Sequence, residues 1–123
     1  LRLTKGETEI LVQMVTLRLL ERQLSSTNLA PSRVVELLER FDDAALAVFA
    51  IASDSAQASS YVDRYREEWR AVQTELTGND LKALGLPPGP RYKEILSSLR
   101  AQKLDGQVAT REDEERFVRA QLV

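Results

Sequence analysis

Residues 76–106 are LTGNDLKALGLPPGPRYKEILSSLRAQKLDG, a segment with two helix starts, two glycine stops and a proline turn. Thr77 is a typical N-cap, Asp80 takes the capping-box position three residues later, and Gly85 suits the exit of this short helix. Pro90 suits the first turn of the next helix. The segment therefore predicts two helices joined by a proline-rich loop.

The second of these helices has two different faces. Its apolar positions form a buried stripe, whereas Lys93, Ser97 and Arg100 form a polar stripe that Lys103 extends. Gly89 at the cap position has no side-chain oxygen, so we expect the backbone N–H groups of residues 91 and 92 to be open. An open helix N-terminus beside cations is a site for phosphate, although an ordinary solvated cationic surface explains the same residues.

Outward from this segment, apolar residues recur with helical spacing almost everywhere. We expect an all-α fold, an irregular bundle of about six to seven helices with no sheet. Residues 1–76 should form one lobe of four helices and residues 77–123 a second lobe, together one compact unit from a larger chain. The four helices of the first lobe are expected over about 10–24, from Pro31 to Phe41, over 43–51 and over about 55–75.

Particular residues have structural roles in this prediction. The stretch DAALAVFAI (43–51) is apolar nearly all round, so we expect other helices on most of its sides. Tyr61, Tyr65 and Trp69 are predicted to fill a core, and Asp42 to cap a helix. The last helix should start after a cap at Thr110 and run to about Leu122. Acidic neighbours such as Glu112–Glu115 suit a helix N-terminus better than a metal site, since adjacent helical positions diverge.

Composition excludes several classes of function. The chain has 123 residues with no cysteine and no histidine, so thiolate and imidazole metal sites and the usual neutral-pH general base are absent. No apolar run reaches the length of a membrane span, and we expect a soluble, cytoplasmic chain without membrane contact. The net charge is −2, but residues 77–110 hold five basic and three acidic side chains. That block is a local basic region in an acidic chain.

The motifs carry a resemblance to a known family. The order Thr-Gly-x-Asp-Leu (77–81), Gly-x-x-Pro-Gly-Pro (85–90), Ile-Leu (95–96) and Leu-Asp-Gly (104–106) resembles the C-terminal signature of bacterial tRNA nucleotidyltransferases and their poly(A) polymerase relatives. The match is specific over Thr77 to about Val118. The resemblance implies the helical body and tail of an enzyme that adds CCA, only A, or an adenosine tail to RNA 3′ ends.

The same resemblance implies how the chain works. Nucleotidyl transfer would belong to an upstream catalytic domain, with ATP or CTP and Mg²⁺ as its cofactors, so this part has no catalytic residue, metal site or cofactor of its own. Its partner would be the acceptor and TΨC side of tRNA, held through the backbone. The expected phosphate-binding residues are Lys82, Gly89, Arg91, Tyr92, Lys93, Ser97, Arg100 and Lys103.

A second hypothesis comes from a different class of function. The first helix has a wide apolar face, so the chain could be an interaction module that docks a neighbouring domain or a second copy of itself. RNA binding should weaken steeply with salt, whereas association through an apolar face should not.

Overall fold

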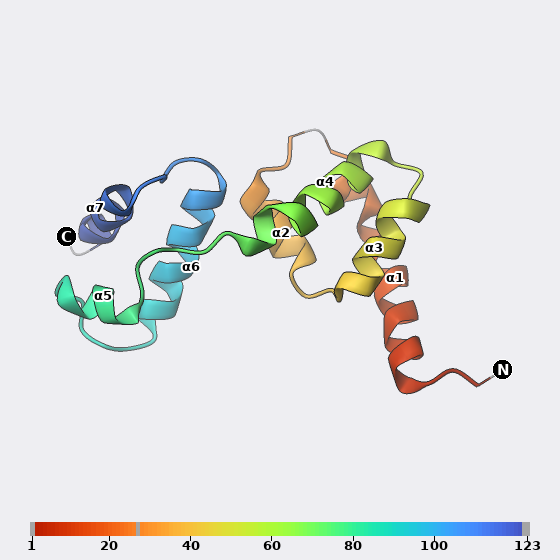
Figure 1. Ribbon diagram of the computed structural model, residues 1–123, viewed down its shortest axis with the longest axis horizontal. Coiled ribbons are helices and arrows are strands. Elements are labelled where there is room, and N and C mark those ends of the chain that lie inside the picture. Colours follow the sequence, from red (N-terminus) through yellow and green to blue (C-terminus); the bar gives the residue numbers. More distant parts are fainter. Residues whose placement is uncertain (1, 27, 122–123) are drawn as a thin grey trace. The chain divides into compact units, whose positions relative to one another are not determined.

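The computed structural model describes residues 2–26 and 28–121, and over these residues the regular structure is entirely helical. This confirms the predicted all-α fold (Figure 1). The elements in chain order are α1 (Lys5–Leu24), α2 (Pro31–Leu38), α3 (Asp43–Ala52), α4 (Ala56–Glu67), the short 3-10 helix η1 (Trp69–Ala71), α5 (Gly78–Ala83), α6 (Arg91–Leu104) and α7 (Arg111–Gln121).

The chain divides into two compact units, the first ending at Arg70 and the second beginning at Ala71. The sequence placed this border six residues later, after Leu76. The difference arises because Leu76 is buried in the second unit, in a cluster with Leu81, Leu99 and Val118. Residues 71–76 therefore belong by packing to the helices that follow them.

In the first unit, α3 packs against α1 and α4, and α2 packs against α4. The predicted aromatic core is confirmed: Tyr61, Tyr65 and Trp69 are all buried, with the rings of Tyr61 and Trp69 6.4 Å apart. Burial of such large side chains is the main favourable contribution to folding. The first turns of α1 extend beyond the other helices of this unit (Figure 1), and residues 2–9 are exposed.

Two features of the first unit differ from the sequence prediction. Helix α3 is covered on one side only: Ala45, Leu46 and Phe49 are buried, but Val48 is 43% and Ile51 88% exposed. Asp42 precedes α3 at its N-cap, yet its side chain makes no capping bond; it accepts a hydrogen bond from Gln13 Nε2 at 3.0 Å. The Asp42 carboxylate thus bonds to Gln13 of α1 and not to the first backbone N–H groups of α3, as a cap would.

Helix α4 is shorter than predicted. It ends at Glu67, and Trp69 lies in a 3-10 turn, with the guanidinium of Arg64 stacked 4.5 Å from the centre of its ring. Beyond Ala71 the chain is not helical until Gly78. The apolar spacing of Val62, Tyr65, Trp69 and Val72 predicted one long helix. Instead, the backbone of residues 72–76 is not helical and forms hydrogen bonds with side chains of α6 and α7, described below.

The second unit is built from α5, α6 and α7 around a core that confirms the predicted buried stripe. Ile95 and Leu99 of α6 are buried, and Tyr92 and Leu96 pack beside them. Gly85 has a φ of +101° and Gly106 a φ of +79°, both in the left-handed region that glycine enters without strain, so each ends a helix as predicted.

Both predicted caps of the second unit are present. At α5, the Thr77 N–H donates to Asp80 Oδ2 at 2.8 Å. At α7, the Asp113 N–H donates to Thr110 Oγ1 and the Thr110 N–H donates to Asp113 Oδ2, each at 3.1 Å. Helix α7 extends at least to Gln121; the predicted end near Leu122 lies outside the described residues. Among the helices that the structure describes, none is long and apolar enough to cross a membrane.

Candidate functional site

A groove in the second unit lies between α6 and the segment that leads into α5. It has a volume of about 650 Å³ and contains the three members of the predicted polar stripe. Its lining residues are Gln73, Thr74, Leu76, Thr77, Gly78, Lys93, Leu96, Ser97 and Arg100. The fold therefore adds a wall, residues 73–78, that helical spacing alone did not reveal.

The cations of the polar stripe are in two different situations. Lys93 and Ser97 are exposed along one side of the groove. Arg100 is half-buried, and its Nε donates to the carbonyl of Val72 at 2.9 Å. Lys103 lies outside the groove lining and its Nζ donates to the carbonyl of Gln73 at 3.0 Å. Arg100 and Lys103 thus hold the wall of the groove in place.

A buried carboxylate completes this attachment. Glu114 of α7 is fully buried, and it accepts hydrogen bonds from the N–H of Glu75 at 2.9 Å and from the N–H of Leu76 at 3.2 Å. Lys103 Nζ lies 3.4 Å from the same carboxylate. A buried charge is tolerated only with such partners, so Glu114 ties residues 75 and 76 to both α6 and α7.

Asp80 stands beside the groove wall at the start of α5. Its carboxylate accepts from the Thr77 N–H and hydroxyl, and Arg111 of α7 lies 3.1 Å away. The bond from the Thr77 amide, aided by its hydroxyl and Arg111, holds the pKa of Asp80 below its ordinary value. Asp80 therefore carries its charge at neutral pH and positions Thr77, as the sequence predicted for a cap.

The start of α6 differs from the prediction. The helix begins at Arg91 with Pro90 in the cap position, one residue later than expected from Gly89. The Tyr92 N–H, expected to be open, donates to the carbonyl of Gly89 at 3.2 Å. The Tyr92 hydroxyl donates to the carbonyl of Leu86 at 2.6 Å, so this side chain holds the LPPGP loop. One of the two expected free amides is therefore already used.

The remaining predicted site residues lie outside the groove lining. Gly89 and Arg91 are exposed at the start of α6, and Lys82 is exposed on α5. Over the described residues, Lys82, Arg91 and Lys93 form no ion pair, in contrast to Lys103 and Arg111. These three cations are consequently available to an anionic ligand.

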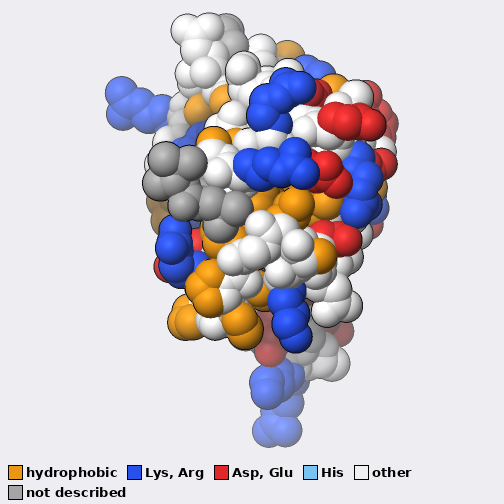
Figure 2. Space-filling view, turned by 90° about the vertical axis from the view of Figure 1, so that its left-hand side faces the viewer, with side chains coloured by type: hydrophobic (Ala, Val, Ile, Leu, Met, Phe, Trp, Pro, Cys, Tyr) orange, Lys and Arg blue, Asp and Glu red, His pale blue; other side chains and the backbone are white. Residues whose placement is uncertain are grey.

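The charges on one face of the molecule are mixed. Figure 2 shows Lys and Arg side chains beside Asp and Glu side chains, with hydrophobic side chains exposed among them. On α7, Arg111 and Arg119 lie 3.5 and 3.9 Å from Glu115, and Arg116 lies 3.5 Å from Asp113. These pairs neutralise much of the positive charge of α7, so the cations of α5 and α6 contribute more to attracting an anion.

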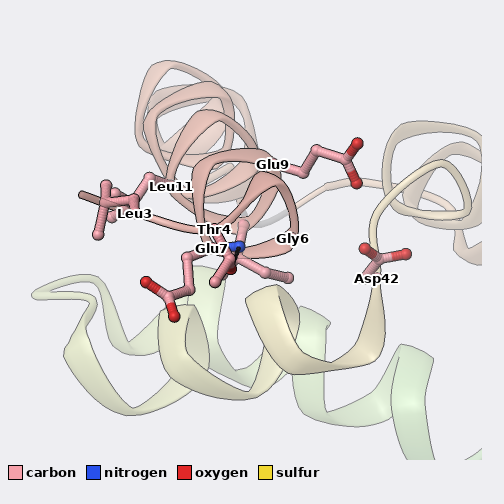
Figure 3. A pocket seen from close by; sticks show the side chains of 8 residues that line it. Leu3, Thr4, Gly6, Glu7, Glu9, Leu11 and Asp42 are labelled. Carbon is pink, nitrogen blue, oxygen red and sulfur yellow. Dashed lines mark hydrogen bonds between the residues drawn. The ribbon is translucent and has the colours of Figure 1, made fainter.

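A second pocket, in the first unit, has a different character. It has a volume of about 700 Å³ at the start of α1 and is lined by apolar side chains with Glu7, Glu9 and Asp42 among them. Figure 3 shows that these three carboxylates point in different directions. Among the described residues, no group of three potential ligands is placed to hold a metal ion.

Comparison with known proteins gives two relatives of one kind. The chain is similar to A-adding tRNA nucleotidyltransferases. That of Geobacter sulfurreducens is 47% identical over 63 residues, which are 51% of this chain and 7% of that protein. That of Halalkalibacterium halodurans is 31% identical over 71 residues, 58% of this chain and 17% of that protein. The chain thus spans only a small part of the relatives' length. No family model and no solved structure matches.

Both relatives bear the kind of name that the motif resemblance predicted, a tRNA nucleotidyltransferase. The sequence did not predict the contacts of Glu114 that hold the wall of the groove in place. Glu114 was assigned to an ordinary acidic helix start, and nothing local distinguishes it from Glu112 or Glu115.

Proposed function

We propose that the second unit binds the sugar–phosphate backbone of tRNA, as the RNA-holding part of an enzyme that adds nucleotides to tRNA 3′ ends. The observation that carries this proposal is the groove in which Lys93 and Ser97 face the wall formed by residues 73–78. A ligand of phosphates and 2′-hydroxyls suits such a site, which combines a cation, a hydroxyl and backbone polar groups. The relatives' names supply tRNA as the RNA.

The structure refines which residues should contact RNA. Lys82, Arg91 and Lys93 are exposed and form no ion pair within the described residues, so they contact phosphates in this proposal. Arg100 and Lys103 donate to the carbonyls of Val72 and Gln73, so their main role is to shape the groove. Gly89 and Tyr92 hold the loop that presents Arg91, because the Tyr92 N–H bonds to Gly89.

We further propose that the enzyme adds adenosine, since both similar proteins are named for A addition. In an enzyme of this kind, ATP and Mg²⁺ would be bound by a separate catalytic domain, and the present residues would hold the substrate tRNA. Recognition through the backbone would make the second unit indifferent to base sequence.

The test is tRNA binding by the chain and two of its variants, measured by fluorescence anisotropy at about 50 mM salt. Lys93→Ala should weaken binding by roughly threefold to tenfold, because the variant has one cation fewer to pair with a phosphate. The matched control is Arg116→Ala, which removes an 80% exposed cation on α7 of the same unit. Equal affinities of wild type and Lys93→Ala, or equal reductions in both variants, would contradict the proposed surface.

A further inference from the structure

Helix α1 carries an apolar stripe on its exposed side. Leu11, Val12, Val15 and Leu19 are 46%, 60%, 63% and 77% exposed. Successive residues of a helix are turned by about 100°, so these four positions fall on one side. The fully buried Leu17 and Leu24 fall on the opposite side. Helix α1 is therefore apolar on two faces, and the fold of the first unit covers one of them.

The two ends of α1 carry different charges beside this stripe. Lys5, Glu7 and Glu9 lie in its first turns, and Arg18, Glu21 and Arg22 lie in its last turns, where Arg18 is 3.8 Å from Glu21. Glu7, Arg18 and Arg22 are on the same flank of the exposed stripe. Two parallel copies of α1 would bring like charges together, and two antiparallel copies would bring opposite charges together.

We propose that this stripe joins two copies of the chain through antiparallel α1 helices, related by a two-fold axis at Val15. In this register Val15 meets its own counterpart and Leu11 meets Leu19 of the other copy. Glu7 of each copy lies near Arg22 of the other, so the face is self-complementary in both shape and charge. This dimer goes beyond the RNA-binding proposal and does not depend on it.

The size of the stripe predicts how stable this dimer is. From these exposed fractions, the four residues expose about 400 Å² per copy, the size of the largest apolar patch on a typical monomer. Two such stripes bury about 800 Å², below the roughly 1,200 Å² at which stable interfaces begin. We therefore expect a weak dimer, with a dissociation constant of roughly 10–1,000 µM.

Sedimentation of the chain from about 1 µM to 1 mM tests the dimer, because the monomer should give way to a dimer over this range. Val15→Glu should abolish the dimer, since it places two carboxylates together on the axis. The matched control is Ile51→Glu, at an 88% exposed apolar residue of α3, which should leave the dimer unchanged. A wild-type chain that stays monomeric at about 1 mM overturns the proposal, and so do equal effects of the two variants.

A cross-linking experiment tests the register, since the chain has no cysteine of its own. Val15→Cys places a single thiol on the proposed axis and should oxidise to a disulfide-linked dimer much faster than Ile51→Cys. Equal rates of cross-linking would overturn the two-fold arrangement.

Exchange of charge gives a second check of the register. Glu7→Arg and Arg22→Glu should each weaken the dimer, and the double variant should restore it.

Discussion

At the scale of single residues, Glu114 joins three parts of the second unit. It is fully buried, and it holds the N–H groups of Glu75 and Leu76 together with Lys103. Glu114→Ala should lower the free energy of unfolding by about 2–4 kcal/mol, because two backbone donors and a cation lose their acceptor. Urea unfolding followed by circular dichroism measures this change.

Two further variants make the Glu114 prediction specific. Glu114→Gln retains an acceptor oxygen and should cost less than Glu114→Ala. Glu112→Ala removes an exposed carboxylate two residues away and should change the free energy of unfolding by no more than about 0.5 kcal/mol. A Glu114→Ala variant as stable as Glu112→Ala would show that the buried carboxylate does not hold residues 75 and 76.

Asp43 makes two short ion pairs on the surface of the first unit. Arg66 Nε lies 2.8 Å and Arg70 Nη1 2.7 Å from its Oδ1. The hydrogen bond from Arg66, followed by that from Arg70, lowers the pKa of Asp43 from 3.8 to about 2. Because the folded pKa is below the unfolded one, the stabilisation is present above about pH 4 and is lost as the pH falls toward about 2.

The expected result is a change in the acid side of the stability profile. Between about pH 4 and pH 2 the wild type should lose stability more steeply than Asp43→Asn, which has no proton to bind at this position. Thermal melts at several pH values measure the two slopes. The matched control is Asp54→Asn, which removes another exposed carboxylate of the first unit, one that forms no ion pair among the described residues. Identical slopes for Asp43→Asn and wild type would contradict the assigned pKa.

Caps with nearby partners and carboxylates with distant partners differ in how well the sequence predicts them. The caps at Thr77 with Asp80 and at Thr110 were predicted correctly, because the bonding partner of each lies only three residues along the chain. The partners of Asp43 lie 23 and 27 residues away, and Glu114 bonds to residues 38 and 39 positions earlier. No local pattern encodes such distant pairs.

At the scale of elements, the end of α4 shows why periodicity can mislead. Helical spacing continues through Val72 to Leu76, but the backbone of residues 72–76 bonds to Arg100, Lys103 and Glu114. These bonds satisfy groups that would otherwise bond within a helix, so tertiary contacts override local preference. The same bonds create the wall of the groove. The predicted polar stripe of α6 was correct, but the wall opposite it could not be foreseen.

The glycine that ends α5 gives a prediction at this scale. Gly85→Ala places a side chain at a φ of +101° and should lower the free energy of unfolding by about 1 kcal/mol or more. Gly6→Ala is the matched control, because Gly6 lies in α1 and an added Cβ meets nothing closer than Thr4 Oγ1 at 4.0 Å. Gly6→Ala should be neutral or stabilising by up to about 1 kcal/mol. Equal effects would contradict the assigned turn.

At the scale of the whole molecule, we propose separate tasks for the two units of the chain. The first would present the apolar stripe of α1 to a second copy, and the second would present cations beside a groove to RNA. The net charge of −2 alone would argue against RNA binding. The distribution of ion pairs makes the proposed binding compatible with this net charge, because acidic partners neutralise α7 and leave Lys82, Arg91 and Lys93 without an ion pair among the described residues.

The salt dependence of tRNA binding shows whether the cations of α5 and α6 contact the RNA backbone. For each phosphate that a variant no longer neutralises, the slope of the logarithm of affinity against the logarithm of salt concentration should become shallower by about 0.7–0.9. The triple variant Lys82→Ala, Arg91→Ala, Lys93→Ala should therefore bind tRNA with a slope shallower by about 2–3 than that of the wild type. The same slope in both proteins would show that these cations do not contact the RNA backbone.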